Sequence, residues 1–320
     1  TVGLGRGNEI ELCKEINFPH SLGLLYSAFT YFCGFRINSG EYKLMGLAPY
    51  GKPKYKDLIL DKLVDVKSDG SFRLNQKYFN YATGLTMTNH NFSKLFSAEP
   101  RKEDENITQF HMDIASSIQS VTEEILLKIC KSVSDEYKIK NLCLSGGVAL
   151  NCVANGKLHE SKLFDNIWVQ PASGDAGGAL GAALALWYSK YTEKNFKKSY
   201  DSMKGSYLGP SYSSDEIKKQ LDQIDANYTL LSHENLIDTV AKDLNQEKII
   251  GWFQGRMEFG PRALGNRSII ANAKSKDMQK KLNMKIKYRE SFRPFAPSIL
   301  REHLSEWFSL NIDSPYMMIV

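Results

Sequence analysis

Several features are missing from this 320-residue chain, and each absence excludes a class of protein. No apolar stretch approaches the roughly 20 residues that a membrane helix needs, and no signal peptide opens the sequence. We therefore expect a cytoplasmic protein without a membrane partner. The five cysteines form no CxxC pair and no regular spacing, which excludes a disulfide framework or a zinc site and indicates buried free thiols.

A strong excess of charge of one sign is also missing. The chain has 41 Lys and Arg against 36 Asp and Glu, a net charge of +5, which does not by itself indicate a nucleic-acid partner. The six histidines never pair at the i,i+4 spacing of metal ligands, and no Ser–His–Asp or Cys–His arrangement can be read from their order. What is present, 42% hydrophobic and 24% charged residues, is typical of a globular protein large enough for two domains.

The two ends of the sequence are unusual. Thr1 stands where an initiator Met would, and the chain stops inside the apolar run Tyr316–Val320. Chain ends usually lie in exposed polar segments. We therefore expect a fragment cut on both sides, whose Thr1–Ile16 hairpin and His20–Phe32 helix expose apolar surface and lead to a homo-oligomer.

Hydrophobic periodicity divides the first part of the chain into regular elements. A stretch from Pro53 to about Asp104 is polar and mixed, which is typical of an elaborated insertion. Around it, the pattern predicts strands at Thr1–Leu4 and Glu9–Ile16, a helix at His20–Phe32 and a long amphipathic helix from about Thr108 to Tyr137.

Two strand–glycine turn–helix units follow, which is typical of an α/β nucleotide-binding lobe. The strand Leu142–Leu144 leads into Ser145-Gly146-Gly147 and a helix through Leu158; the strand Ile167–Val169 leads into Gly174–Gly178 and the helix Ala179–Tyr188. Turns at the carboxyl ends of neighbouring strands face one crevice, although a bare Ser-Gly-Gly turn is often free of ligand. The candidate nucleotide-binding residues are Ser145, Gly146, Gly147, Asn151, Gly174 and Gly177.

Asp175 adds a carboxylate to the second turn. A carboxylate at this position can hold a metal ion or cap the following helix, and the spacing alone leaves both possibilities open.

The second part of the chain begins after a polar, lysine-rich stretch at Tyr191–Lys204, which predicts a linker. Ser213 and Glu216 form a capping box. The pattern predicts helices at Ser213–Gln223, Asn235–Gln246 and Lys276–Ile286 and strands at Lys248–Phe253, Ser268–Asn272 and Phe295–Leu300, a second α/β or α+β domain.

Five arginines and two lysines gather in residues 255–268 and 285–294, interleaved with glycine, proline and apolar residues. This pattern differs from a solvated charged face. Guanidinium groups match phosphate oxygens bidentately, so it predicts a compact pocket for phosphate or carbamoyl phosphate. RNA binding is the alternative, but it requires prominent aromatic residues for stacking, and we favour the small anion. The cluster comprises Arg256, Arg262, Arg267, Lys285, Lys287, Arg289 and Arg293.

Five stretches, in order along almost the whole chain, resemble the NodU-like O-carbamoyltransferases. These are Pro19–Ser27, Gly40–Gly51, Leu144–Asn151, Gly174–Gly178 and Gly255–Pro297. The resemblance implies an α/β fold with an actin-like ATPase-type lobe at 1–190, similar to the TsaD/glycoprotease proteins, with an insertion at about 53–104. A linker at 191–206 and a YrdC-like carbamoyl phosphate-binding domain at 207–320, truncated at its C-terminal end, would follow.

The resemblance also implies a chemistry. Carbamoyl phosphate and ATP, the latter with Mg, would give carbamoyl-adenylate and pyrophosphate, and the carbamoyl group would pass to a hydroxyl of a small-molecule or sugar acceptor. Asp175 would bind iron or another divalent metal, whose paired histidine ligands would lie upstream of Thr1. Carbamoyl phosphate would contact Arg256, Arg262, Arg267, Lys287, Arg289 and Arg293, with Arg262, Lys287 and Arg293 catalytic.

Two alternatives to this function stay open. A threonylcarbamoyl-type tRNA modification enzyme would use similar modules, but a much larger basic surface would be expected of it. A nucleotide-binding module that has lost catalysis is the other alternative.

Overall fold

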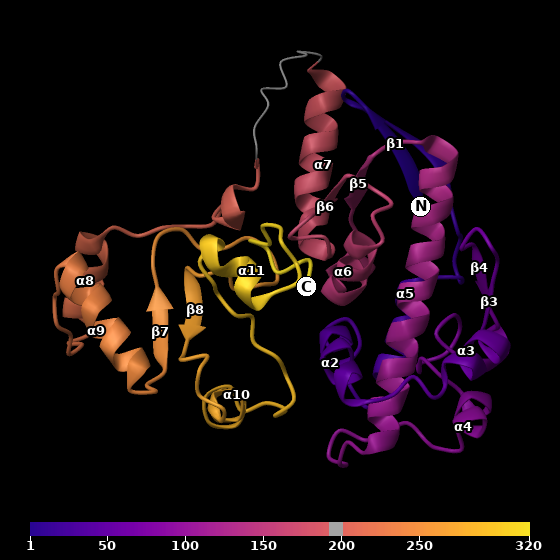
Figure 1. Ribbon diagram of the computed structural model, residues 1–320, viewed down its shortest axis with the longest axis horizontal. Coiled ribbons are helices and arrows are strands. Elements are labelled where there is room, and N and C mark those ends of the chain that lie inside the picture. Colours follow the sequence, from indigo (N-terminus) through magenta and orange to yellow (C-terminus); the bar gives the residue numbers. More distant parts are fainter. Residues whose placement is uncertain (192–200) are drawn as a thin grey trace. The chain divides into compact units, whose positions relative to one another are not determined.

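The computed structural model describes residues 1–191 and 201–320, and the chain divides into two units. Unit 1 is Thr1–Lys194 with Met318–Val320, and unit 2 is Asn195–Met317. Helices and strands are mixed in both units, so the predicted α/β class is confirmed (Figure 1). The actin-like and YrdC-like assignments stay predictions, and most of the predicted linker lies outside the described residues.

Unit 1 contains three separate two-stranded sheets. The pairs β1–β2 and β3–β4 are antiparallel, and the pair β5–β6 is parallel. The strands are β1 (Val2–Arg6), β2 (Glu9–Lys14), β3 (Val64–Val66), β4 (Phe72–Leu74), β5 (Asn141–Leu144) and β6 (Asn166–Val169). The helices are α1 (Leu22–Phe32), α2 (Glu41–Leu47), α3 (Lys56–Lys62), α4 (His90–Phe96), α5 (Gln109–Tyr137), α6 (Cys152–Glu160) and α7 (Asp175–Lys190).

The long helix α5 organises the core of unit 1. It begins with a capping box, in which Thr108 N donates to His111 Nδ1 at 3.1 Å, and it ends at Lys138, whose φ of 55° is left-handed. Helices α1, α2, α3 and α6 all contact it. Its buried face recurs at helical spacing and includes Ile114, Ile118, Val121 and Ile125.

Aromatic side chains fill the space between α1 and α4. The ring of Phe92 lies 5.2 Å from that of Phe29 and 4.9 Å from that of Phe32, both edge to face. The polar segment at 53–104 therefore contributes directly to the core, with Ile59, Leu63, Phe72, Leu74, Phe92 and Phe96 all buried. The prediction that α1 exposes apolar surface is wrong, because seven of its residues are buried; on the hairpin, Ile10 and Leu12 are exposed as predicted.

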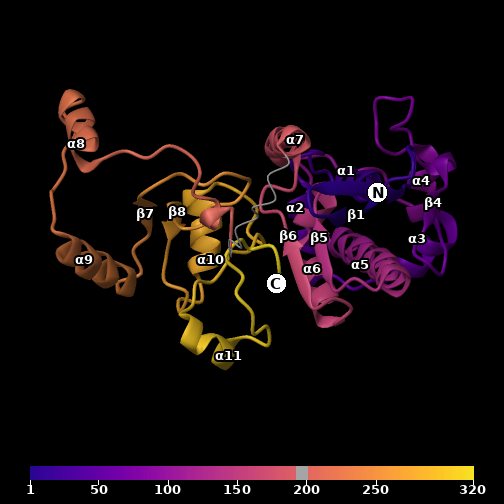
Figure 2. The same ribbon diagram turned by 90° about the horizontal axis from the view of Figure 1, so that it is seen from above.

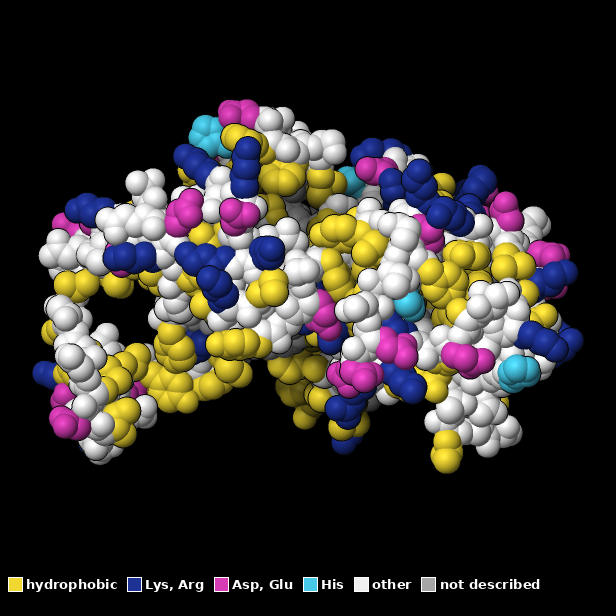
Figure 3. Space-filling model, turned by 90° about the horizontal axis from the view of Figure 1, so that it is seen from below, with side chains coloured by type: hydrophobic (Ala, Val, Ile, Leu, Met, Phe, Trp, Pro, Cys, Tyr) yellow, Lys and Arg dark blue, Asp and Glu magenta, His cyan; other side chains and the backbone are white. Residues whose placement is uncertain are grey.

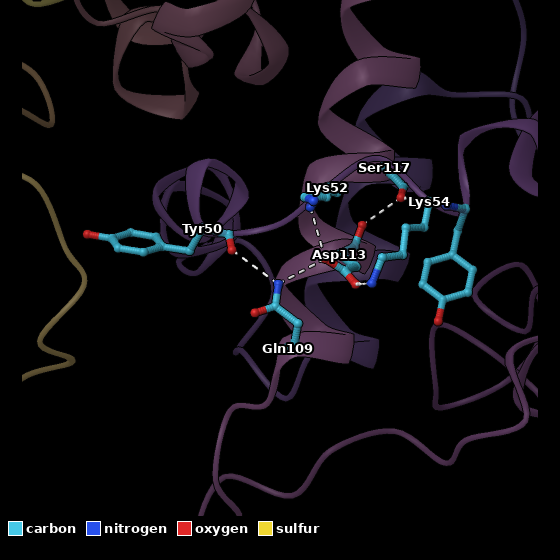
Figure 4. A network of polar contacts seen from close by, with 7 residues as sticks. Tyr50, Lys52, Lys54, Gln109, Asp113 and Ser117 are labelled. Carbon is cyan, nitrogen blue, oxygen red and sulfur yellow. Dashed lines mark hydrogen bonds and ion pairs between the residues drawn. The ribbon is translucent and has the colours of Figure 1, made fainter.

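A buried carboxylate holds the Gly51–Lys54 segment against α5 (Figure 4). Asp113 is 2% exposed and accepts hydrogen bonds from Lys52 N at 2.9 Å, Gln109 Nε2 at 3.0 Å and Lys54 Nζ. Burial alone would raise the pKa of Asp113, but the bonds from Lys54, Lys52 and Gln109 outweigh it and hold this pKa below its usual value. The backbone at Gly51 lies so close to α5 that a Cβ placed on Gly51 would be 2.0 Å from Met112 O, so only glycine fits there.

Unit 2 has one antiparallel strand pair, β7 (Ile250–Phe253) with β8 (Arg267–Ile270), among its described residues. Its helices are α8 (Ser214–Gln223), α9 (His233–Asn245), α10 (Met278–Lys281) and α11 (Leu304–Trp307). The capping box of Ser213 and Glu216 is confirmed. The predicted helix at Lys276–Ile286 is only partly right, because α10 gives way to a π-turn at Leu282–Ile286.

The predicted strand Phe295–Leu300 is wrong, since no regular element forms there. Pro294 and Pro297 cannot donate a ladder hydrogen bond, which disfavours a strand over this stretch. Leu300, which the apolar pattern placed inside a sheet, is 64% exposed.

The apolar interior of unit 2 is small. Its buried apolar side chains are Met203, Met278, Leu282 and Tyr316. Helices α8 and α9 bury no residue, and their apolar side chains, such as Ile224 and Ile237, are exposed. Many apolar side chains of the chain are visible on the surface in Figure 3.

All five cysteines are free thiols. Cys33, Cys130 and Cys152 are buried as predicted, but Cys143 is exposed, because it lies on the open side of the short β5–β6 sheet. Among the described residues, no helix combines the length and the apolar character that crossing a membrane would require.

Candidate functional site

The two glycine turns of unit 1 lie next to each other. Strands β5 and β6 pair in parallel with Leu144 opposite Val169, so the segments that follow the two strands leave the sheet at the same edge (Figure 2). Gly146 N donates to Ser173 O at 2.9 Å and links the two turns directly. The backbones of both turns and the beginning of α7 therefore lie together, where one ligand can contact them.

Glycine is required at different positions of these turns for different structural reasons. Gly146 has a φ of +99°, and no atom lies within 4 Å of a Cβ placed on it or on Gly147, so a ligand can approach this backbone closely. At Gly177, by contrast, a Cβ would lie 2.0 Å from Ala172 O. Glycine at that position is needed for packing α7 against the turn, and its contact with a nucleotide stays a prediction.

The side chain of Asn151 is already engaged inside unit 1. Its Oδ1 accepts from Ala154 N at 3.0 Å and from Gln119 Nε2 at 3.1 Å, and its Nδ2 donates to Gln119 Oε1 at 2.9 Å. Asn151 thus caps α6 and joins it to α5. Ser145 is exposed at the end of β5, and Gly174 is the N-cap residue of α7.

In unit 2, a buried carboxylate fixes the loop that carries Arg262. Glu258 Oε1 accepts from Leu264 N at 2.9 Å, Asn266 N at 2.8 Å and Arg267 N at 3.1 Å. Burial opposes ionisation, but these backbone bonds prevail and lower the pKa of Glu258. Glu258 lies within the arginine-rich motif. The sequence does not indicate that its carboxylate accepts hydrogen bonds from the backbone of the same loop.

Arg256 and Arg267 lie on this loop and use donors within the protein. The Arg267 guanidinium lies 3.4 Å from the ring centroid of Phe253, and its Nη1 donates to Gln254 O at 2.6 Å. Arg256 is exposed, and its Nη2 donates to Leu208 O at 3.4 Å. Both arginines shape the loop, and their contact with an anion stays a prediction.

Three of the predicted cations, Lys287, Arg289 and Arg293, come together after α10. The pKa of Lys287 is lowered, first by partial desolvation and then by repulsion from Arg289 and Arg293. Arg289 Nε donates to Asn283 Oδ1 at 2.6 Å, and its guanidinium lies 4.8 Å from the ring of Phe295. Arg293 Nη1 lies 3.6 Å from Glu290 Oε2. Three cations with one carboxylate beside them form a positively charged group suited to a phosphate-like anion.

We call Lys287, Arg289 and Arg293 the cation cluster. The side-chain amide of Asn283 holds the backbone of this cluster. Asn283 is fully buried, and its Nδ2 donates to Ser291 O at 3.1 Å and to Arg293 O at 2.8 Å. The sequence did not predict these bonds of Asn283, because the residue lies within a basic segment that has a helical pattern. Arg262 lies half-buried in the loop fixed by Glu258.

Models of one protein family match both parts of the chain. The carbamoyltransferase N-terminus matches residues 2–184, and the carbamoyltransferase C-terminus matches residues 241–320. The chain belongs to the carbamoyltransferase family.

Curated relatives of this carbamoyltransferase chain are similar over nearly its whole length. An uncharacterised protein of Synechocystis is 58% identical over 99% of the chain and 52% of the relative. Nodulation protein NolNO of Sinorhizobium fredii is 36% identical over 97% of the chain and 43% of the relative. Nodulation protein NolO of Bradyrhizobium diazoefficiens is 35% identical over 95% of the chain and 53% of the relative. The chain thus spans about half the length of these relatives.

The metal expected of this carbamoyltransferase chain has one candidate ligand, Asp175. Asp175 is exposed at the first turn of α7, where a negative charge is favourable beside the helix N-terminus. Over residues 1–191 and 201–320, no group of three or more His, Cys, Asp or Glu lies together as metal ligands would. Asp175 by itself does not complete a metal site.

Proposed function

We propose that this carbamoyltransferase chain binds carbamoyl phosphate and ATP and serves an ATP-dependent transfer of the carbamoyl group to a hydroxyl. The observation that carries the proposal is the cation cluster, in which the buried Asn283 bonds to Arg289 Nε at 2.6 Å and to Arg293 O at 2.8 Å and so holds the two arginines near Lys287. Like charges held together repel each other, and an anion placed among them relieves that repulsion. The phosphate of carbamoyl phosphate has the charge and the oxygen geometry that arginine and lysine bind.

The same cations assist the first step as we propose it. Water attacks the carbonyl carbon of carbamoyl phosphate, the C–O bond to the bridging oxygen breaks, and carbamate, inorganic phosphate and a proton result. Negative charge develops on the departing phosphate oxygens, and preorganised guanidinium and ammonium donors stabilise that charge. Glu258 acts indirectly, because it holds the backbone of the Arg262 loop.

The glycine turns of unit 1 are proposed to bind ATP. No atom lies within 4 Å of a Cβ placed on Gly146 or Gly147, so a phosphate group can approach the backbone of this turn closely. A carbamate oxygen then displaces pyrophosphate from the α-phosphorus and forms carbamoyl-adenylate. An acceptor hydroxyl finally attacks the carbamoyl carbon and loses its proton to water, and AMP leaves.

Calorimetric titration of the 320-residue chain with carbamoyl phosphate tests the donor site. We expect Arg293→Ala and Lys287→Ala each to weaken binding by roughly tenfold or more, because each removes a charge-assisted hydrogen bond. Arg293→Lys should recover it only in part, since a point charge cannot reproduce a bidentate contact. Arg301→Ala is the matched control, because this arginine is exposed and pairs with Asp313 at 2.6 Å. Equal affinity in Arg293→Ala and Arg301→Ala would contradict the proposal.

ATP binding is tested by a pair of glycine substitutions. A Cβ meets open space at both Gly147 and Gly181, so alanine should be accommodated at either position. We expect Gly147→Ala to weaken ATP binding, because the methyl group blocks the approach to the turn, whereas Gly181→Ala inside α7 should not. Equal titrations of the two variants would reject the turn as the nucleotide site.

A further inference from the structure

A buried polar network connects α1, α5 and the glycine turn that follows β5. Its members are Tyr26 on α1, Gln119 on α5 and Asn151 at the end of the turn, which are 6%, 5% and 8% exposed. Two helices that are far apart in the sequence thus reach the turn through side chains that are nearly closed to water. A buried polar group is costly unless it is hydrogen-bonded, so each of these side chains needs partners inside the protein.

Gln119 and Asn151 form a reciprocal pair of amides. Gln119 Nε2 donates to Asn151 Oδ1 at 3.1 Å, and Asn151 Nδ2 donates back to Gln119 Oε1 at 2.9 Å. Because the two bonds close a ring, neither amide can rotate without breaking one of them. The pair therefore fixes the Asn151 side chain in direction as well as in distance.

Two further partners define the orientation of the Gln119 amide. Tyr26 Oη donates to its Oε1 at 3.0 Å, and its Nε2 donates to Glu123 Oε1 at 2.8 Å. Burial raises the pKa of Tyr26, so the phenol stays protonated and acts as the donor. The Glu123 carboxylate only accepts. A reversed amide would place its oxygen against this carboxylate, so only one orientation satisfies the network.

Asn151 connects this network to the turn. Its Oδ1 also accepts from Ala154 N at 3.0 Å, which caps α6, and its backbone N donates to Val148 O at 3.0 Å, which closes the turn. At the opposite end of the turn, Gly146 N donates to Ser173 O at 2.9 Å. The turn is therefore held at both ends, by the neighbouring glycine turn on one side and by α5 on the other.

Packing contributes little at the glycine end of this turn. Gly146 and Gly147 have no side chain to pack, and no atom lies within 4 Å of a Cβ placed on either. The nearest atom to a Cβ placed on Gly23 of α1 is Val148 Cγ2 at 3.5 Å, an ordinary van der Waals distance. The glycine end therefore depends on hydrogen bonds, which need their partners at a fixed distance.

We infer that Gln119 is a positioning residue for the nucleotide-binding turn. It does not contact the ligand. Through the amide pair it holds Asn151 in place, and Asn151 keeps the backbone at Gly146 and Gly147 in the form that a phosphate group can approach. The inference rests on the proposed function, in which this turn binds ATP.

Two measurements on the 320-residue chain test the inference, calorimetric titration with ATP and amide hydrogen exchange without ATP. Gln119→Leu leaves Asn151 Nδ2 without its acceptor, so we expect the ATP affinity to fall about tenfold and the Gly146 N–H to exchange about tenfold faster. Gln109→Leu is the matched control, because it removes an exposed amide from the same helix, where Gln109 Nε2 bonds to Asp113 Oδ1 at 3.0 Å. Both quantities should stay close to wild type in the control.

A second variant gives a readout that a loss of stability alone would not produce. Gln119→Glu retains an oxygen that accepts from Asn151 Nδ2, but it loses the donor to Asn151 Oδ1. The carboxyl group that it introduces faces the Tyr26 phenol and the Glu123 carboxylate, and burial together with Glu123 favours its protonated form. Protonation restores the donor. The ATP affinity of this variant, relative to wild type at the same pH, should therefore recover as the pH falls from about 8 to about 6.

Three outcomes overturn the inference. Unchanged exchange of the Gly146 N–H in Gln119→Leu would show that the amide pair does not hold the turn. Equal ATP affinity in Gln119→Leu and Gln109→Leu, or no recovery of Gln119→Glu at the lower pH, would show that the pair does not serve nucleotide binding. Circular dichroism establishes that each variant is folded, and the pH series of Gln119→Glu decides if Gln119→Leu is not. Because exchange is measured without nucleotide, it fails independently of the Gly147→Ala test of the ATP site.

Discussion

Arg101 in unit 1 and Arg267 in unit 2 both donate to backbone carbonyls, but their surroundings differ. Arg101 is 8% exposed, and its guanidinium donates to Cys33 O at 2.7 Å and Gly34 O at 3.3 Å and lies 5.5 Å from the ring centroid of Phe35. Arg267 lies on a loop, stacked on the ring of Phe253, which is itself 55% exposed. The first arginine is enclosed by a core, and the second supports a surface that can receive a ligand.

The same difference extends over both units. Unit 1 buries aromatic and aliphatic side chains from six helices. Among the described residues of unit 2, the buried polar residues are as numerous as the buried apolar ones, and they are Ser206, Glu258, Asn266 and Asn283. Apolar burial is non-directional and tolerates small shifts, but a buried polar group needs its partner at a fixed distance. We infer that unit 1 is stabilised mainly by packing and unit 2 mainly by bonds from side chains to the backbone.

The largest test of this comparison is Phe92→Ala. Phe92 is fully buried among Phe29, Phe32 and Phe96, so its loss should cost about 3–5 kcal/mol of unit 1 stability. Denaturant unfolding followed by tryptophan fluorescence reports on unit 1 when Trp252 and Trp307 are replaced by Phe, and on unit 2 when Trp168 and Trp187 are replaced instead, because each unit holds two of the four tryptophans. Met278→Ala in unit 2 should cost less. Equal costs would remove the distinction between the two interiors.

Glu258 provides the matching test for unit 2. Glu258→Ala leaves three backbone N–H groups without their acceptor, which should cost about 3 kcal/mol or more, since each unsatisfied group costs roughly 1–3 kcal/mol. Glu258→Gln retains an acceptor oxygen and should lose less. Both variants should also weaken carbamoyl phosphate binding if the Arg262 loop takes part. Unchanged unfolding of Glu258→Ala would show that packing, and not this carboxylate, holds the loop.

Asp113→Asn probes a buried carboxylate in the unit 1 interior. The amide oxygen can still accept from Lys52 N, but the charge opposite Lys54 is lost, so we expect a cost of about 1–2 kcal/mol at neutral pH. Because folding lowers the pKa of Asp113 below 3.8, its stabilisation is complete above that pH and is lost as the pH falls through the folded value. Acid titration of unfolding should therefore be less steep in Asp113→Asn. Identical acid profiles would contradict this.

The smallest effects concern helix caps. Ser213→Ala removes the acceptor of Glu216 N at 3.3 Å, a change typically worth about 1 kcal/mol. Since α8 buries no residue, this loss should appear as faster amide exchange within α8 alone. Thr108→Ala at the beginning of α5 should instead lower the unfolding free energy of all of unit 1. Local exchange in both variants would indicate that α5 is less integrated than its buried face suggests.

Prediction from the sequence succeeded where local pattern determines structure. The long helix was predicted at Thr108–Tyr137 and observed at Gln109–Tyr137, because its apolar period continues over 29 residues. The strands and glycine turns around residues 142–178 were also confirmed, since glycine at a strand end restricts the local alternatives. The strand at Phe295–Leu300 failed because an apolar pattern does not reveal whether a partner strand exists.

Prediction of individual site roles was limited by contacts distant in sequence. Asn151 bonds to Gln119, 32 positions earlier, which no local motif reveals. Glu258 and Asn283 act on the backbone of loops that take their form only when folded. The arginine-rich motif indicated a chemistry, whereas the division of labour among its members required the structure.

The return of Met318–Val320 to unit 1 has a consequence for synthesis on the ribosome. Asn155 Nδ2 donates to Met318 O at 2.8 Å, Val320 N donates to Cys152 O at 3.3 Å, and a Cβ on Gly156 would lie 1.9 Å from Val320 O. Helix α6 therefore lacks these partners until residue 320 has been translated. Domains commonly fold in order of synthesis. Here the contacts of α6 with Met318–Val320 can form only after all of Asn195–Met317 has emerged, so this face of α6 stays uncovered while unit 2 is being synthesised.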